Sequence, residues 1–437
     1  MTFRERVVVI GGGLAGLRLA QRLAPAPVTV LGEESHDPYN RVLLAEVLAG
    51  RFAPEVAALP DPGPVLRRGV RAVRIDRAER LVHCDDGTTE AYGTLVLATG
   101  SNPVLPPLRG LFDLEAPRSG GGGELPDGVH AFRTMDDCLA LSQTLRDRPG
   151  LRAVVIGGGL LGVSAARALA VRGAQVVLAH QGSRLMERQL DEDAAVLLHA
   201  HLSGLGVEIH TECRVRGLAA VPVGSRRTVT GVDLADGFRL DADLVVLACG
   251  VRPRVGLAQA AGLAVGSGVL VDDRLRTSDP RIHAVGDCAE HAGRTYGLAG
   301  PALEQADVLA AVLQDRPARY TGTRALTRLT LAAPAAPAGP PASADPEAPA
   351  AAEAQAAPVG ALDLAAFGET TPRPGDDVVS LADTTRRTYR KVVVRGDRLV
   401  GGVLLGELST VGALARSWEG DEPLDQLFHL LTDDGGS

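Results

Sequence analysis

The chain has 437 residues, and about two or three domains are expected at this length. Hydrophobic residues make up 45% and charged residues 22%, a composition typical of packed cores with a solvated surface. The formal net charge of −8 argues against non-specific binding to nucleic acid or anionic lipid. No apolar run reaches the ~18 residues of a membrane span, and the N-terminus leads straight into an apolar segment. We therefore expect a cytoplasmic protein without a membrane partner.

The first segment with a chemical signature begins at residue 7. An apolar, β-branched run at 7–10 leads into Gly11-Gly12-Gly13-Leu14-Ala15-Gly16, and an Ala- and Leu-rich stretch follows. This order predicts a buried strand, a tight turn and a helix after the third glycine of the motif. The first glycine permits the turn, the second lets a pyrophosphate approach the backbone, and the third lets the helix pack on the strand. The pattern therefore predicts a dinucleotide site formed by Gly11, Gly13, Leu14, Ala15 and Gly16.

A second strand is expected at residues 28–31, and two acids follow it. An acid at the end of this strand is suited to the hydroxyl pair of a dinucleotide ribose. Glu33 is our first choice for this contact and Glu34 the reserve. Further along, residues 95–98 form a short apolar run that ends at Thr99-Gly100, which predicts another strand of the same sheet.

The glycine pattern then occurs a second time. Residues 154–156 lead into Gly157-Gly158-Gly159-Leu160-Leu161-Gly162, and an Ala-rich stretch follows. Two such cradles predict two dinucleotides. An apolar run at 244–248 ends at Cys249-Gly250, much as the run at 95–98 ends at Thr99-Gly100, and the two runs flank the second cradle. We therefore expect an α/β fold with two Rossmann-like domains, in which the second (128–242) is inserted into the first (1–112 and 243–320).

Low-complexity stretches and a hairpin signal mark the rest of the chain. Residues 120–123 are a flexible glycine run, and residues 332–358 are almost all Ala and Pro, a composition that predicts a disordered insertion. Residues 389–394 and 399–405 alternate around Arg395-Gly396-Asp397-Arg398, which indicates a β-hairpin, and a helix is expected at 407–417. Residues 321–437 should form a small α+β C-terminal domain that contains the Ala/Pro insertion.

The cysteines and histidines form no metal or redox motif. No two of the five cysteines are spaced as CxxC or CxxxxC, so a redox disulfide, a zinc clasp and an iron–sulfur cluster are unsupported, and small buried thiols are expected. His199 and His201 lie two apart on a predicted helix, hence on different faces, and we expect both to be solvated. We expect no bound metal.

The order of these motifs resembles the pyridine nucleotide-disulfide oxidoreductase superfamily, and within it the branch without a redox disulfide, which includes rubredoxin and ferredoxin reductases. A narrower likeness is to the FAD- and NADH-binding front half of the assimilatory nitrite reductase large subunit. It is carried by the segments PYNRVLL (38–44), ATGSNP (98–103), LMERQLD (185–191) and EQA (304–306). The resemblance implies FAD in the first domain and NADH or NADPH in the second.

The same resemblance implies the residues of both sites. Residues 277–287 resemble the superfamily stretch whose aspartate accepts hydrogen bonds from the FAD ribityl chain, here Asp287. Residues 301–305 would open a helix whose N-terminus stabilises negative charge on the reduced flavin. The implied FAD contacts are Gly11, Gly13, Leu14, Ala15, Gly16, Glu33, Glu34, Arg41, Ala98, Thr99, Gly100, Gly286, Asp287, Glu304 and Gln305. The implied NAD(P)H contacts are Gly157, Gly159, Leu160, Leu161, Gly162, His180, Arg184 and Gly250.

Two positions depart from the family pattern. In related reductases the helix after the second cradle usually carries a glutamate close to the nicotinamide, and the matching residue here is Ser164, with Glu46 of the flavin loop as a candidate substitute. After the strand expected at 176–179, an acid would favour NADH and an arginine NADPH, whereas this chain has His180 and Gln181, with Arg184 further on. Because neither of the first two supplies a fixed positive charge, we expect a modest preference for NADH.

The expected function is that of an FAD-dependent NAD(P)H oxidoreductase that passes electrons to an external redox protein. The cofactors carry out the hydride transfer, so Arg41, Glu46 and Ser164 are expected near the flavin and nicotinamide without acting as an acid or base. The resemblance implies a nitrite or nitrate reductase component as acceptor. Two alternatives stay open, a rubredoxin or ferredoxin reductase and a flavin redox sensor that does not turn over.

Overall fold

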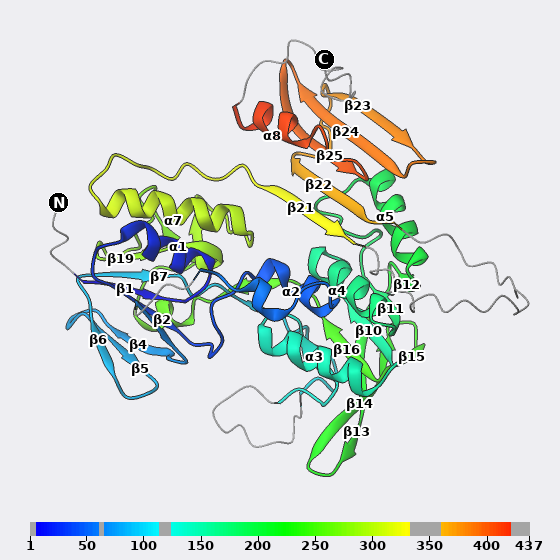
Figure 1. The fold of residues 1–437 in the computed structure, drawn as a ribbon, viewed down its shortest axis with the longest axis horizontal. Helices are drawn as coiled ribbons and strands as arrows, with labels where there is room; N and C mark the ends of the chain where they lie inside the picture. Colours follow the sequence, from blue (N-terminus) through cyan, green and yellow to red (C-terminus); the bar gives the residue numbers. More distant parts are fainter. Residues whose placement is uncertain (1–5, 61–64, 113–123, 333–359, 421–437) are drawn as a thin grey trace, which may run out of the picture.

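The computed structural model describes residues 6–60, 65–112, 124–332 and 360–420, and three five-stranded sheets organise these residues (Figure 1). The glycine run at 120–123 and, apart from Ala332, the expected Ala/Pro insertion lie outside the described residues. No helix among those described is long and apolar enough to cross a membrane.

The first sheet has the strand order β19-β7-β1-β2-β3, with every neighbouring pair parallel. Its central strand β1 is fully buried, as expected for a parallel strand covered on both faces. Strand β19 follows the second glycine pattern in the sequence, yet it pairs with β7, which precedes that pattern. The first sheet is therefore built from two chain segments, one that precedes the second domain in the sequence and one that follows it. The bounds are β1 Val7–Ile10, β2 Val28–Gly32, β3 Leu66–Arg68, β7 Thr94–Leu97 and β19 Ile282–Ala284.

Two helices cover one face of this sheet and are joined to each other by ion pairs. Helices α1 (Leu14–Leu23) and α7 (Ala299–Leu313) lie side by side (Figure 1), and Asp307 of α7 pairs with Arg18 at 2.7 Å and Arg22 at 2.8 Å. Helix α1 begins at Leu14, so the expectation of a helix starting after Gly16 was wrong by one turn. Gly13 is the N-cap and Gly16 lies inside the helix, where its missing side chain allows close packing.

The second sheet has the order β12-β11-β10-β16-β9 and is also parallel throughout. Its strands are β9 Val129–Ala131, β10 Arg152–Ile156, β11 Gln175–Ala179, β12 Val207–His210 and β16 Leu244–Leu247. Its helices are α3 Met135–Asp147, α4 Leu160–Val171 and α5 Glu192–Gly204. The two chain crossings between the sheets, β8 (Ser101–Pro103) and β17 (Val251–Pro253), pair antiparallel. The expected fold class, one Rossmann-like domain inserted into another, is confirmed.

Smaller elements decorate both domains. Strands β4, β5 and β6 form an antiparallel sheet and lie in the sequence between strands β3 and β7 of the first sheet. Strands β13, β14 and β15 form another and lie between strands β12 and β16 of the second sheet. Strands β18 and β20 form a parallel pair. Their bounds are β4 Ala72–Asp76, β5 Leu81–Cys84, β6 Thr89–Ala91, β13 Val215–Val223, β14 Arg226–Leu234, β15 Arg239–Asp241, β18 Val269–Val271 and β20 Ala289–His291. The short helices are α2 Leu44–Leu48 and α6 Gly256–Ala260, with 3-10 turns at Arg41–Leu43, Pro54–Ala57 and Gly286–Cys288.

The C-terminal sheet is antiparallel, with the order β21-β22-β25-β24-β23. The predicted hairpin is present as β24 and β25, joined by Gly396 and Asp397. Helix α8 begins at Val411 rather than at residue 407, because Thr410 takes the position before the helix and its carbonyl accepts from Ala413 and Leu414. The bounds are β21 Leu326–Leu331, β22 Leu362–Gly368, β23 Asp377–Asp383, β24 Thr388–Arg395, β25 Arg398–Leu405 and α8 Val411–Gly420.

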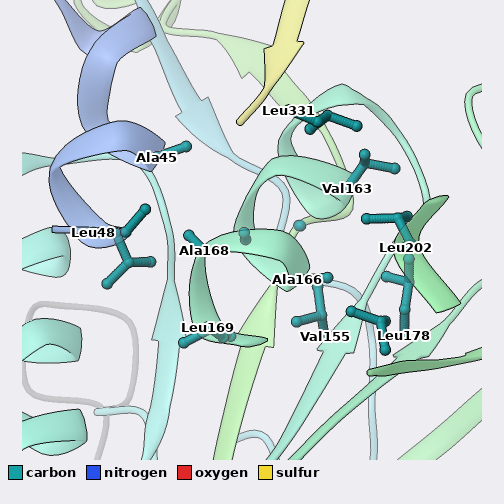
Figure 2. Packing of buried hydrophobic residues seen from close by; sticks show 14 of the residues in the cluster. Ala45, Leu48, Val155, Val163, Ala166, Ala168, Leu169, Leu178, Leu202 and Leu331 are labelled. Carbon is teal, nitrogen blue, oxygen red and sulfur yellow. The ribbon is translucent and has the colours of Figure 1, made fainter. Parts of the chain in front are cut away.

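Helix α4 lies where the three parts of the molecule meet. In Figure 2 its apolar side chains pack among residues of α2, of the second sheet and of the C-terminal strand β21. These neighbours include Ala45, Leu48, Val155, Leu178 and Leu331. The helix that begins at the second glycine cradle is thus in direct contact with both other domains.

Candidate functional site

The first glycine cradle is shaped by two close backbone approaches. Gly11 has φ +123°, and a Cβ placed on it would lie 2.0 Å from the Ala98 carbonyl oxygen at the end of β7. A Cβ on Gly16 would lie 2.0 Å from the Gly11 oxygen. Around Gly13, the N-cap of α1, there is open space, and no side chain caps the helix. The backbone N–H groups at Leu14 and Ala15 therefore face a space suited to a pyrophosphate.

The two acids after β2 have different partners. Glu33 is ion-paired with Arg254, whose second nitrogen lies 2.9 Å from Glu33 Oε2. The backbone of Arg254 is bound in turn to the strand end that the sequence singled out: Gly100 accepts from its N–H, and Thr99 donates to its carbonyl over 3.0 Å. Glu34 instead accepts from Tyr39 over 2.6 Å. Glu33 is thus paired with a residue that is bound to the end of β7, whereas Glu34 is paired within the loop that follows β2.

Arg41 and Glu34 belong to a polar cluster that fixes the loop after β2. Arg41 donates to Glu34, to the Tyr39 hydroxyl over 2.9 Å and to the Arg133 carbonyl over 3.0 Å. The Tyr39 hydroxyl also accepts from the backbone N–H of Met135 over 2.9 Å. Burial raises the pKa of Tyr39 above its usual value, so this hydroxyl stays protonated and can donate. The cluster joins the loop that carries Arg41 to the N-terminus of α3.

Asp287 follows Gly286, and Gly286 lies against the first residues of α1. Gly286 has φ +77° and packs between Ala15 of α1 and Ala302 of α7. Its N–H donates to Gln305 Oε1 over 2.7 Å, and Gln305 is 1% exposed. Glu304, in contrast, is exposed and accepts from Thr323. The structure thus places Gly286 beside α1 and joins it to Gln305, while Glu304 binds the loop of Thr323.

The Asp287 carboxylate is held by a residue that sequence reasoning missed. Its Oδ2 accepts from Ser101 over 2.8 Å and from Arg133 over 2.8 Å. The Arg133 Nε is buried and has no hydrogen-bond partner among the described residues. A buried donor without a partner beside an oriented carboxylate fits a polar ligand that completes the site. Arg133 precedes the Thr134 capping box of α3, a signal that predicts a helix start but no charge partner.

The second cradle repeats the geometry of the first. Gly157 has φ +116° and a Cβ on it would lie 2.4 Å from the Ala248 oxygen, while a Cβ on Gly162 would lie 1.7 Å from the Gly157 oxygen. Gly159 is the N-cap of α4, has open space around it and leaves the helix uncapped. The N–H groups at Leu160 and Leu161 open this helix. Gly250, beyond the end of β16, has φ +96° and also faces open space.

His180 follows β11 and lies over the second cradle. Its Nδ1 accepts from the Gly158 N–H over 3.1 Å, so the ring proton is on Nε2 and the ring is neutral. That Nε2 is buried without a hydrogen-bond partner among the described residues. A neutral donor at this position fits a ribose hydroxyl. Arg184, the other candidate, donates to the Leu190 carbonyl of its own loop over 3.3 Å.

Ser164 and Glu46 have separate partners. The Ser164 hydroxyl donates to the Leu160 carbonyl one turn earlier over 2.8 Å, and the residue is 6% exposed. Glu46 Oε1 accepts from Arg167 over 2.5 Å. The structure therefore gives Glu46 a partner on α4 that lies one turn beyond Ser164, and sequence reasoning did not single out Arg167.

The remaining cysteine and histidine predictions have mixed outcomes. All five cysteines are free, and Cys84, Cys138 and Cys288 are buried as expected, whereas Cys213 and Cys249 are only partly buried. His201 is 3% exposed, so its expected solvation was wrong, because α5 turns that side towards the core while His199 faces solvent. Within the described ranges no group of three or more His, Cys, Asp or Glu side chains is arranged to hold a metal ion.

Comparison with known proteins identifies the family. Residues 5–306 match the family described as "Pyridine nucleotide-disulphide oxidoreductase". Residues 359–417 match the family described as "Rubredoxin NAD+ reductase C-terminal domain". The chain belongs to the pyridine nucleotide-disulphide oxidoreductase family. It is therefore an oxidoreductase whose cofactors are FAD and NAD(P)H, as the sequence predicted, and the residues of both cradles fit these dinucleotides.

Individual relatives cover nearly the whole chain. It is 30% identical to the assimilatory nitrate reductase electron transfer subunit of Bacillus subtilis (strain 168) over 416 residues, which are 92% of this chain and 48% of that protein. It is 32% identical to the nitrite reductase (NAD(P)H) of the same strain over 423 residues, 93% of this chain and 46% of the relative. The chain thus spans about half the length of these relatives. The ferredoxin reductase for the CYP199A2 system from Rhodopseudomonas palustris has a similar structure, with a TM-score of 0.77, 26% identity, and coverage of 96% of this chain and 95% of that one.

Proposed function

We propose that this protein takes hydride from NADH onto FAD and passes the electrons to a separate protein, the haem- or iron–sulfur-bearing component of a nitrite or nitrate reductase. The observation that carries the proposal is the pair of uncapped helix N-termini, on α1 and α4, each with open space beside its N-cap glycine. Similarity to an electron transfer subunit over 92% of the chain supports the direction of electron flow.

In this proposal the first domain binds and orients FAD. The N–H groups of α1 bind the pyrophosphate, Glu33 accepts from the ribose hydroxyls, and Asp287, held by Ser101 and Arg133, accepts from the ribityl chain. The N-terminus of α7 stabilises negative charge at the pyrimidine edge. Bound FAD supplies the redox chemistry by taking up the hydride and releasing its electrons.

The second domain, in the same proposal, binds NADH in preference to NADPH. The N–H groups that open α4 bind its pyrophosphate, and His180 Nε2 donates to an adenosine ribose hydroxyl. A 2′-phosphate in that place would carry about two negative charges towards a neutral ring, without a fixed cation to balance them. The margin should be modest, because Arg184 supplies a positive charge on the loop that follows His180.

Two features of the proposal concern organisation and location. The FAD domain comprises residues 1–112 and 243–320, the NAD(P)H domain 128–242 and the C-terminal domain 321–437. We place the protein in the cytoplasm, where a reducing environment keeps thiols such as its five free cysteines unpaired.

A second candidate is a rubredoxin or ferredoxin reductase. It is favoured by the match of residues 359–417 to the rubredoxin reductase C-terminal domain and by the similarity to a ferredoxin reductase structure over almost its full length. The chemistry up to the reduced flavin is the same in both candidates, and only the acceptor differs.

The acceptor is tested by supplying each candidate in turn. The purified holoprotein should oxidise NADH with ferricyanide but consume no nitrite by itself, and nitrite loss should begin when the sirohaem-bearing nitrite reductase component is added. Nitrite consumption by the flavoprotein alone would contradict the proposal. Faster transfer to rubredoxin or ferredoxin would favour the second candidate. A flavin that NADH reduces but that no acceptor reoxidises would indicate a redox sensor.

A further inference from the structure

A buried ion pair joins the flavin-side loop to the helix of the second cradle. Glu46 lies in α2, directly after the turn Arg41–Leu43, and Arg167 lies in α4, which begins beside Gly159. Their side chains are 14% and 1% exposed, and Arg167 Nη2 lies 2.5 Å from Glu46 Oε1. A second nitrogen of Arg167 donates to the Ala332 carbonyl over 3.0 Å, where the C-terminal strand β21 ends.

The surroundings of this pair are apolar on the side of α4, while on the side of α2 the half-exposed Arg51 lies with its Nη1 3.6 Å from the second Glu46 oxygen, Oε2. Arg167 is the one charged residue in the sequence of α4, LLGVSAARALAV. Figure 2 shows the neighbouring side chains of α4 packed among those of α2 and β21. Replacement of a buried ion pair by well-packed apolar residues is often neutral or stabilising, so stability alone does not account for a pair in this place.

The pair also lies next to the position where the expected carboxylate is missing. Ser164 and Arg167 are three residues apart on α4 and so share a face of the helix. Because the Ser164 hydroxyl donates to its own helix, the polar contact from this face to α2 is made by Arg167. The carboxylate of the pair, Glu46, comes from the flavin-side loop, and the guanidinium, Arg167, comes from the NADH helix.

We infer that Arg167 is a positioning residue for hydride transfer, which acts through Glu46 to hold the flavin loop in register with the NADH helix. The inference rests on the proposed function. Both ends of the pair are attached to elements that orient a reactant: α2 continues the loop of Arg41, and α4 begins at the cradle for the NADH pyrophosphate. A misalignment of about 1 Å between the reacting atoms can slow a reaction by about a hundredfold.

The test compares three single variants by anaerobic rapid mixing with NADH. Arg167→Met and Glu46→Gln should each slow flavin reduction at saturating NADH by about tenfold or more, and the dissociation constant for NAD+, read from the flavin absorbance, should change by less than about threefold. Arg172→Met is the matched control. Arg172 also crosses from α4 to α2, where it donates to the Leu48 carbonyl over 3.2 Å, but it does not touch Glu46. This variant should keep the parent rate.

A double variant separates positioning from folding. Glu46→Gln leaves the buried Arg167 charge unpaired, and Arg167→Met leaves Glu46 with only the more distant Arg51, at 3.6 Å. Both single changes are therefore expected to lower the thermal midpoint, whereas Glu46→Gln/Arg167→Met removes both charges of the buried pair. The double variant should recover the midpoint but remain slow. A double variant that recovers the rate, single variants at the parent rate, or an equal loss in Arg172→Met would overturn the inference. If NADH does not reduce the flavin of the parent protein, the proposed function fails and the inference fails with it. This outcome differs from the three above, in all of which the parent flavin is reduced.

Discussion

The N-cap glycines of the two cradles give matched predictions about which dinucleotide binds where. Gly13 and Gly159 have φ −85° and −80°, which alanine adopts without strain, and nothing lies within 4 Å of a Cβ built on either residue. An alanine methyl group there would point into the space assigned to a pyrophosphate. Gly13→Ala should therefore release FAD and spare NAD+ binding, and Gly159→Ala should do the reverse.

The sizes of these effects follow from the local geometry. Alanine is a poorer N-cap than glycine by up to about 1 kcal/mol, which corresponds to a fall in thermal midpoint of about 2–4 °C for a domain of this size. Exclusion of the pyrophosphate should raise the KM for NADH in Gly159→Ala by at least about tenfold, or about 1.4 kcal/mol. Gly162→Ala is a contrasting variant, because its Cβ would lie 1.7 Å from the Gly157 oxygen and should destabilise the fold by about 3 kcal/mol or more.

The assay needs four readings on each variant: the ratio of flavin to protein absorbance, the dissociation constant for NAD+ by calorimetry, the KM for NADH with ferricyanide where flavin is retained, and the thermal midpoint. A Gly159→Ala protein with a KM within twofold of the parent would refute the assignment of the pyrophosphate to the N-terminus of α4. So would loss of FAD from that variant with NADH binding intact, because it would mean that the two cradles had been assigned the wrong way round.

Four further outcomes are expected. Asp287→Ala should lower flavin occupancy, because the ribityl chain loses its acceptor, and full occupancy with unchanged affinity would remove Asp287 from the site. His180→Arg should shift kcat/KM at pH 8 towards NADPH, while a parent enzyme with a tenfold preference for NADPH would contradict the assignment of His180. Burial lowers the pKa of His201 and His283 to about 4, so between about 6.5 and 4 the unfolded chain binds more protons. The free energy of unfolding should then fall as pH falls through this window, by up to about 1.4 kcal/mol per pH unit for each histidine, and denaturant titrations of His201→Gln should show a smaller fall. Replacement of residues 333–358 by a short Gly/Ser linker should leave the thermal midpoint and ferricyanide activity nearly unchanged, and a large loss in either would mean that the segment packs or binds a partner.

The dinucleotide cradles could be predicted from the sequence because their chemistry is local. Three glycines at fixed spacing after an apolar strand determine a turn, a close backbone approach and a helix start, and Gly11 and Gly157 have nearly the same φ for this reason. The interleaving of the domains was also predictable, since strand ends of one type flank the second cradle. The exact start of α1 was not, because a glycine can either precede a helix or lie in its first turn.

The partners of the site residues could not be predicted, because they come from distant parts of the chain. Asp287 pairs with Arg133, Glu33 with Arg254 and Glu46 with Arg167, and no periodicity relates the members of these pairs. The burial of His201 was missed for a related reason. Helix α5, which carries His201, contacts both its own sheet and strand β25 of the C-terminal domain. The face of α5 that was expected to be exposed to solvent is therefore buried.

The central claim is that NADH reduces a flavin held in the first cradle and that the electrons then leave the protein. It is tested most directly by anaerobic mixing of the holoprotein with one equivalent of NADH, followed by a second mixing with an electron acceptor. We predict that the visible flavin absorbance bleaches completely in the first step and returns in the second, with two equivalents of a one-electron acceptor such as ferricyanide reduced for each flavin that is reoxidised. A flavin that keeps its colour in the presence of NADH would contradict the account.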